Sequence, residues 1–206
     1  MERGRLEAFS DGVFAVAITL LALDLTVAGP EEGSLAHQLL SHWPAFVAYL
    51  ISFFTIGVIW VNHHVLFASL VRLDRTMLFV NLLLMLFVVA IPFATATMAE
   101  YVAEGGPDSR LATAIYGAVM TGMASSFGLV LNRAITHGHM ADPLEPAARA
   151  AAQRRFGGGI LVYVCATLLA LLNAPAAFAC YGAVAMFYVL EQTPSRQAVT
   201  SPQRRE

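Results

Sequence analysis

The sequence contains no lysine, and only 13% of its 206 residues are charged. Soluble domains usually carry about a quarter charged residues, so this composition excludes an ordinary soluble domain. All of the basic side chains, which number 12, are arginines, and the formal net charge is −2. Hydrophobic residues make up 58% of the chain, and the mean hydropathy is +0.66. These values indicate an integral membrane protein with no room for a large soluble domain.

Motifs for catalysis and metal binding are absent. The only cysteines, Cys165 and Cys180, stand in apolar runs without a CxxC or other metal-ligand spacing, so we expect inert, buried thiols. The sequence has no GxSxG, no HExxH and no glycine-rich phosphate loop. We therefore predict that the protein is not an enzyme and holds no cofactor or resident metal.

Long hydrophobic runs are the main feature that is present. They cover residues 6–27, 44–69, 76–99, 111–136, 156–173 and 176–191. About twenty residues cross the hydrocarbon core, so the pattern predicts an all-α protein with six transmembrane helices. The last two runs are separated by Asn173-Ala174-Pro175, where we expect a tight hairpin. Asp11 and Asp24 argue against a cleaved signal peptide, so the first run is expected to be a mature helix.

The arginines divide the chain into two sides. With six spans, eleven of the twelve share one side, and only Arg110 falls on the other, in a loop that also holds Glu100, Glu104 and Asp108. Cytoplasmic loops of membrane proteins are enriched in basic residues. We therefore expect a multi-pass protein of the inner membrane, with both termini in the cytoplasm and an acidic outer face.

The loop of residues 136–155 is the longest connection, and its Ala/Arg-rich half is expected to form a short helix at the membrane surface. His137 and His139 stand in this loop, and a solvated loop is favoured over a metal site because no further ligands are evident. Residues 1–192 are predicted to form the transmembrane domain, and residues 193–206 a disordered cytoplasmic tail.

One face of the first span has a distinct composition. At about 100° per residue, Gly12, Leu20 and Leu23 lie within about 40° of Val16, and Thr19 flanks them. Asp24 lies beside the outer end of this stripe. A helix buried inside a monomeric bundle is the favoured interpretation of this stripe, and a functional surface is the alternative. The residues alone leave both interpretations open.

Polar residues also occur at membrane depth, where they usually face protein or water. The first span carries Arg5, Ser10 and Asp11 at one end, and the second and third spans carry a histidine pair and an asparagine: His63, His64 and Asn81. A hydrogen-bonded clamp that fixes the first helix is the favoured interpretation. A proton relay or a metal site is the alternative.

The segment RLEAFSD at residues 5–11 carries an RxxxFSD pattern. With the following GVFAVAITLLALDL and the later WVNHH, it resembles the transmembrane protein 175 family of potassium channels, in its prokaryotic branch. The resemblance covers nearly the whole chain as a single six-helix unit.

The resemblance implies a homotetramer in the lipid bilayer with the first helix lining a central pore for potassium ions. It implies that Val16 and Thr19 occupy pore positions, that Leu20 and Leu23 form apolar rings and that Asp24 lies near an outer vestibule. It further implies that the Arg5/Ser10/Asp11 end turns into protein, near a histidine of the second span. The family lacks a TVGYG filter, and this chain contains none.

The function predicted from the sequence is thus a potassium-selective cation channel with a hydrophobic constriction and no nucleic-acid partner. A proton-coupled or proton-conducting transporter is one alternative. Carriers usually show inverted repeats or broken helices, and the sequence shows neither. A purely structural membrane protein is the other alternative.

Overall fold

The computed structural model describes residues 3–27, 29, 31, 33–142 and 144–191. Within these ranges the regular structure is helical: α1 (Arg3–Leu21), η1 (Ala22–Asp24), α2 (Leu35–Ser41), α3 (Trp43–Ala68), α4 (Arg75–Tyr101), α5 (Gly106–Thr136), α6 (Pro146–Ala170) and α7 (Ala174–Glu191). The expected all-α class is confirmed. The tail predicted for residues 193–206 lies outside the described residues.

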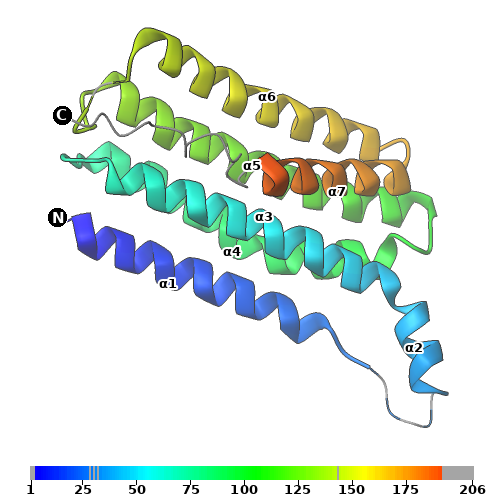
Figure 1. Cartoon of the computed structure of the whole chain (residues 1–206). Helices are drawn as coiled ribbons and strands as arrows, with labels where there is room; N and C mark the ends of the chain where they lie inside the picture. Colours follow the sequence, from blue (N-terminus) through cyan, green and yellow to red (C-terminus); the bar gives the residue numbers. More distant parts are fainter. Residues whose placement is uncertain (1–2, 28, 30, 32, 143, 192–206) are drawn as a thin grey trace, which may run out of the picture.

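The long helices run side by side in one bundle, with α1 and α6 on opposite sides of it (Figure 1). α1 packs against α3 and α4, whereas α6 packs against α5 and α7. The start of α1, the α3–α4 connection and the α5–α6 connection lie at one end of the bundle. The α4–α5 connection, the α6–α7 hairpin and α2 lie at the other end (Figure 1). The arginine-rich connections therefore share one end.

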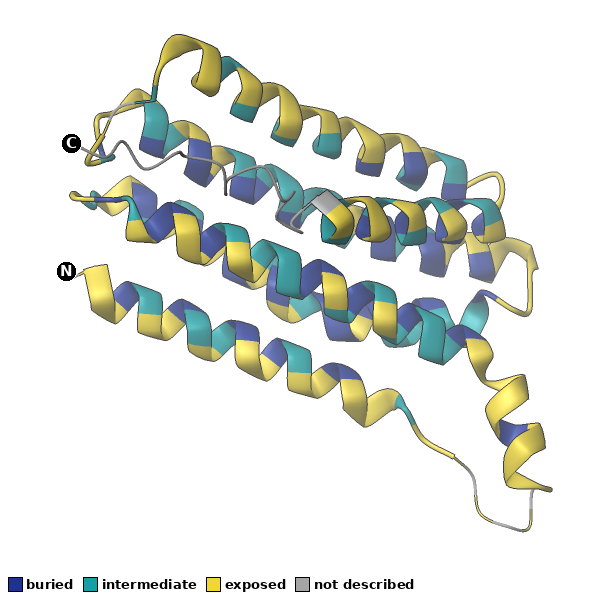
Figure 2. Ribbon diagram, in the orientation of Figure 1, coloured by how far each residue is buried: buried dark blue, intermediate teal, exposed yellow. Residues whose placement is uncertain are grey.

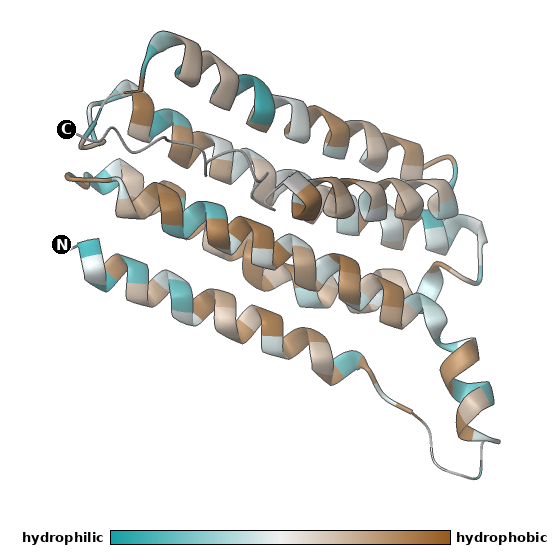
Figure 3. Ribbon diagram, viewed as in Figure 1, coloured by the Kyte–Doolittle hydropathy of each residue, from teal (hydrophilic) through white to brown (hydrophobic). Residues whose placement is uncertain are grey.

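Four helices of the described chain are long and apolar enough to cross a membrane: the segment Arg3–Asp24, α3, α4 and α5. Brown, apolar ribbon dominates the middle of α3 and α4 in Figure 3, while hydrophilic residues gather at the start of α1 and of α6. α7 is a shorter apolar helix over Ala174–Leu190. The molecule is thus a multi-pass helical bundle whose polar segments lie at the helix ends.

Residues with clear capping roles begin several helices. The Asp74 carboxylate accepts a hydrogen bond from the Met77 amide at 2.7 Å and caps α4, and the Ser34 hydroxyl accepts one from the His37 amide and caps α2. Proline stands in the first turn of α3, α5 and α6, where its missing N–H costs nothing. The hairpin expected around Asn173 is present, and the Asn173 side chain accepts from the Ala176 amide at 3.0 Å.

The structure corrects several sequence-based expectations. The two thiols are not buried, because Cys165 is exposed and Cys180 is only half-buried. Residues 146–155 do not form a separate surface helix, because α6 continues without a break from Pro146 to Ala170. Alanine, arginine and glutamine are strong helix formers, so nothing in this stretch ends the helix before the apolar run begins. The sequence analysis also missed α2, whose seven residues are too few for a periodic signal.

Two glycines of α5 permit close contacts with neighbouring helices. A Cβ added at Gly117 would lie 2.1 Å from the Tyr181 hydroxyl, and one at Gly122 would lie 2.2 Å from the Phe87 ring. These distances are far below van der Waals contact, so α5 approaches α4 and α7 only because the glycines lack a side chain.

Gly122→Ala is therefore expected to destabilise the α4–α5 contact by about 1–3 kcal/mol, as overpacked cores do. Thermal unfolding of the purified protein measures the loss. Gly157→Ala is the matched control, because a Cβ there meets nothing within 4 Å. An unchanged midpoint in Gly122→Ala would mean that the helices separate at little cost.

Candidate permeation surface on the first helix

The α1 helix buries only one side. Its buried residues follow a helical repeat of three or four: Leu6, Ser10, Phe14, Ala17 and Leu21. They face α3 and α4, while the opposite side of α1 stays uncovered (Figure 2). A soluble bundle would leave such a face to water, but an apolar face in a membrane protein must meet lipid, another copy of the chain or a pore.

Of the predicted stripe residues, Val16, Thr19 and Leu20 lie on this uncovered side of α1, and Leu23 is exposed in the η1 turn that follows. The exposed fractions are 53% for Val16, 39% for Leu20 and 69% for Leu23, and Thr19 is exposed beside them. The interpretation of this stripe as the core of a monomeric bundle is therefore wrong for the single chain. The side of α1 that packs into the core is formed by its buried residues, above all Phe14 and Leu21.

Thr19 presents a hydroxyl oxygen on that face. Its Oγ1 donates to the Val16 carbonyl at 2.8 Å, a bond within the same helix. The hydroxyl proton is thus used inside α1, and the oxygen lone pairs remain directed away from it. A hydroxyl in this state acts as a hydrogen-bond acceptor or a cation ligand.

Asp24 is exposed at the end of η1 and borders a cleft of about 550 Å³ at the end of the bundle away from the N-terminus. Glu100 and Glu104, from the end of α4 and the turn after it, line the same cleft, together with His42. The carboxylates make the electrostatic potential in this cleft negative, which raises the local concentration of cations. Asp24 thus shares the cleft with two of the acids that the sequence predicted for the outer face, and its role in a vestibule stays a prediction.

The buried side of α1 carries a polar chain across three helices. The Asn81 amide donates to the Ser10 hydroxyl at 3.0 Å, and the Asn81 carbonyl oxygen lies 2.8 Å from His63 Nε2. The three side chains are almost fully buried. The Phe67 ring stacks on His63 with the centroids 4.1 Å apart, and Phe14 meets its edge. This hydrogen-bonded network of Ser10, Asn81 and His63 fixes α1 against α3 and α4.

Not every predicted polar residue belongs to that hydrogen-bonded network. Arg5 and His64 are exposed, and His64 lies beside the Trp60 ring. Asp11 accepts a hydrogen bond from Trp60 Nε1 at 2.9 Å instead of meeting a histidine. No sequence pattern predicts this contact, because an indole partner for Asp11 leaves no periodic signal.

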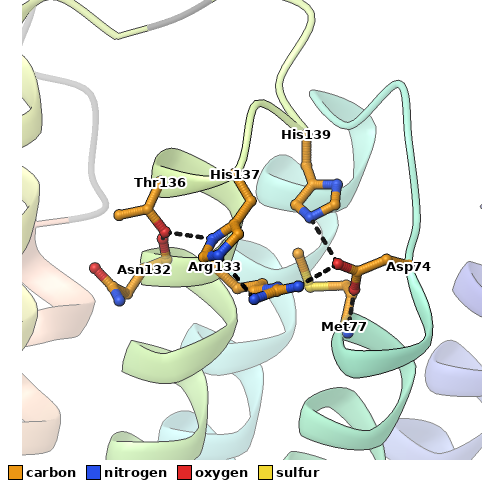
Figure 4. A network of polar contacts seen from close by, with 7 residues as sticks. All are labelled: Asp74, Met77, Asn132, Arg133, Thr136, His137 and His139. Atoms are coloured by element: carbon orange, nitrogen blue, oxygen red, sulfur yellow. Dashed lines mark hydrogen bonds and ion pairs between the residues drawn. The ribbon is translucent and has the colours of Figure 1, made fainter.

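A second polar network lies at the arginine-rich end and was not predicted (Figure 4). Arg133 near the end of α5 pairs with Asp74 at the start of α4, and His139 Nε2 lies 3.3 Å from the same carboxylate. His139 is buried, so the expectation of a solvated loop is wrong for this residue. The backbone follows the same path, because the Val71 amide donates to the His139 carbonyl at 2.8 Å. These contacts tie the α3–α4 and α5–α6 connections together.

The Arg133 guanidinium, the Met77 amide and the nearby His139 lower the pKa of Asp74 to about 2. A carboxyl whose pKa is depressed on folding stabilises the protein above its unfolded value of 3.8, and this stabilisation is lost as the pH falls toward 2. Asp74→Asn should therefore lower the unfolding temperature at neutral pH, and the difference from wild type should shrink between about pH 4 and pH 2. Unfolding scans across that range measure it; a constant difference would contradict the ionic role of Asp74.

Metal binding gains no support from the geometry. Among the residues that the structure describes, no group of three or more His, Cys, Asp or Glu side chains is close enough to hold an ion. His137 contacts Arg133 and Thr136 rather than a ligand set (Figure 4).

A helical bundle with four helices long and apolar enough to cross a membrane has the architecture of a multi-pass membrane protein. The model of the family described as "Endosomal/lysosomal potassium channel TMEM175" matches residues 5–92. A potassium channel of Streptomyces collinus is 45% identical over 195 residues, which cover 94% of each chain. The chain therefore belongs to the TMEM175 family of ion channels.

The family also contains a solved structure and longer animal proteins. The crystal structure of a lysosomal potassium-selective channel TMEM175 homolog from Chamaesiphon minutus superimposes with a TM-score of 0.82 at 34% identity, covering 94% of this chain and 99% of that one. The human protein named endosomal/lysosomal proton channel TMEM175 is 32% identical over 191 residues, which cover 84% of this chain and 36% of the human one. Membership of an ion-channel family points away from an enzyme.

Proposed function

We propose that this protein is a homotetrameric, potassium-selective cation channel whose central pore is lined by α1. The observation that carries the proposal is the uncovered face of α1 with Val16, Thr19 and Leu20, continued by the exposed Leu23 of η1. Four copies arranged around an axis turn each of these residues into a ring. Relatives named potassium channels cover almost the whole chain and support the same assignment.

The proposed topology has six membrane-spanning helices, of which α6 and α7 are the last two. It places the protein in the inner membrane with both termini in the cytoplasm. Its support is the gathering of the arginine-rich connections at the end of the bundle where the chain begins (Figure 1). The acidic cleft around Asp24 then lies on the outer side, where it attracts cations before they enter the pore.

In the proposed mechanism, leucine rings form the constriction and Thr19 supplies polar contact. A leucine ring offers no ligand, so an ion passes partly hydrated, and such constrictions also close by dewetting. Potassium gives up hydration water more readily than sodium, so a narrow path with few ligands favours potassium. A tenfold preference needs only about 1.4 kcal/mol, which a few hydroxyl contacts supply.

Thr19→Ala is expected to shift the bi-ionic potassium/sodium reversal potential toward zero while the pore still conducts. Removing one hydroxyl from each subunit takes away ligands without narrowing the path. Planar-bilayer recording of purified protein measures the effect. Thr97→Ala is the matched control, because its hydroxyl donates to Phe93 within α4 at 2.9 Å but lies off α1. An unchanged reversal potential in Thr19→Ala would remove Thr19 from the ion path.

Proton conduction is the second candidate function, because the human relative carries the name of a proton channel. Reconstituted liposomes with an internal pH dye and an outward potassium gradient separate the candidates. A potassium channel sets the membrane potential with little internal acidification until a protonophore is added. Unitary currents exclude a carrier, whose turnover is too slow to produce them, and liposomes without any ion flux would leave only a structural role.

A further inference from the structure

The α6–α7 pair encloses a groove that the permeation surface does not use. Its volume is about 430 Å³, and its walls include Gly158 and Val162 from α6 and Val184, Phe187 and Tyr188 from α7. Arg155 lines the same groove, with its guanidinium over the Phe156 ring. The groove is therefore apolar over its length and cationic at one end.

The two glycines that line this groove, Gly158 and Gly159, have different surroundings. A Cβ at Gly159 would lie 2.3 Å from the Tyr188 hydroxyl, so this glycine lets α7 approach. A Cβ at Gly158 would meet nothing within 4 Å, so the space beside it is open. The groove thus has a closed floor at Gly159 and a free volume at Gly158.

The location of the groove favours lipid over a second copy of the chain. α6 lies on the opposite side of the bundle from α1 (Figure 1), so a pore lined by α1 turns α6 outward. The outer side of α6 is apolar and uncovered, with exposed fractions of 63% for Leu161 and 60% for Leu168. Such a side meets the acyl chains of the bilayer.

The charges at the cationic end favour an anionic headgroup. Arg155 lines the groove, and Arg149 and Arg154 are exposed in the same first half of α6. Glu145 and Asp142 precede the helix, so the arginines exceed the described acids of this segment. A guanidinium forms paired hydrogen bonds with a phosphate, and each arginine near a membrane surface attracts anionic lipid with about 1 kcal/mol.

We propose that the α6–α7 groove is a binding site for one anionic phospholipid. Arg155 contacts its phosphate, and one acyl chain occupies the open space beside Gly158 and runs along Val162 and Phe187. The site requires α6 and α7 to span the bilayer, as proposed above, but its occupancy does not depend on potassium selectivity. Lipid retention is read without ion flux, so failure of this inference and failure of the proposed function are distinguishable.

Native mass spectrometry of the purified, full-length protein tests the proposal with phosphatidylglycerol and phosphatidylcholine of identical acyl chains. Wild type should retain phosphatidylglycerol preferentially. Arg155→Gln should reduce that preference about fivefold, the equivalent of one arginine near a membrane surface. Gly158→Leu should abolish lipid retention, because the leucine side chain fills the groove. The added Cβ meets nothing within 4 Å, so the fold should tolerate the change.

Gly157→Leu is the matched control, because Gly157 is equally open but lines a different groove, between α5 and α6. It should retain phosphatidylglycerol as wild type does. Equal retention of the two lipids by wild type, or normal retention by Gly158→Leu, would overturn the proposal. So would a change of oligomeric mass in Gly158→Leu, which would make the groove an interface between copies. Displacement of the lipid by excess inorganic phosphate would show a free-anion site and would overturn it as well.

Discussion

Leu23→Asn is expected to raise the single-channel current about fivefold. Leu23 is 69% exposed, more than Val16 or Leu20, so its own chain covers only a small part of it. In the proposed tetramer four leucines form an apolar ring that resists wetting, and asparagine replaces this ring with groups that bind water. Lowering the barrier by about 1 kcal/mol is sufficient for a fivefold gain.

The matched control for this prediction is Leu161→Asn on α6. Leu161 is 63% exposed, close to Leu23, but it lies on the opposite side of the bundle from α1. Its replacement should leave the unitary current unchanged. Planar-bilayer recordings of both variants, with size-exclusion profiles to show intact assemblies, measure the difference. Equal currents in wild type and a correctly assembled Leu23→Asn protein would exclude Leu23 from the constriction.

Asn81→Leu is expected to cause the largest loss of stability of any single change considered. Asn81 is fully buried and bonds both Ser10 on α1 and His63 on α3. Leucine has a similar volume but bonds neither, so it leaves two buried polar groups unpaired at a cost of about 2–4 kcal/mol. The unfolding temperature should fall by roughly 10 °C. Because the same contacts hold α1, assembly around α1 should weaken too.

Asn62→Leu separates this network effect from the loss of an asparagine in general. The Asn62 amide donates only to the Val58 carbonyl of its own helix at 2.8 Å, so its removal should cost much less. Thermal unfolding and the fraction of assembled protein measure both variants. If Asn81→Leu is as stable as Asn62→Leu, the Ser10–Asn81–His63 chain does not hold α1 in place.

The two predictions concern opposite sides of the same helix. Ser10 and Phe14 are buried on the side of α1 that packs against the bundle, and Val16 and Thr19 are exposed on the same helix. The exposed side of α1 faces away from its neighbours (Figure 2). A weakened network therefore disturbs the position of every ring residue. The stability of the buried side and the conductance of the uncovered side are coupled through the rotation of one helix.

The sequence by itself determined the all-α class, the approximate positions of the long helices, the arginine-rich end and the composition of the stripe that begins on α1. Each of these depends on local properties: run length, charge placement and a repeat of 3.6 residues. The sequence also predicted that Ser10 and a histidine of the second span lie near each other, but it did not distinguish between His63 and His64. It also joined Arg5 and Asp11 to that group, where the structure gives Asp11 to Trp60 and leaves Arg5 exposed.

Only the tertiary structure decided which partners meet across the bundle. Ser10 and Asn81 are 71 residues apart in the chain, and Asp74 and Arg133 are 59 apart. Their contacts depend on how each helix is rotated and shifted against its neighbours, and a side-chain repeat within one helix does not fix that rotation. His63 is buried and His64 exposed because successive helical residues point about 100° apart, and packing against Phe14 and Phe67 selects which one turns inward.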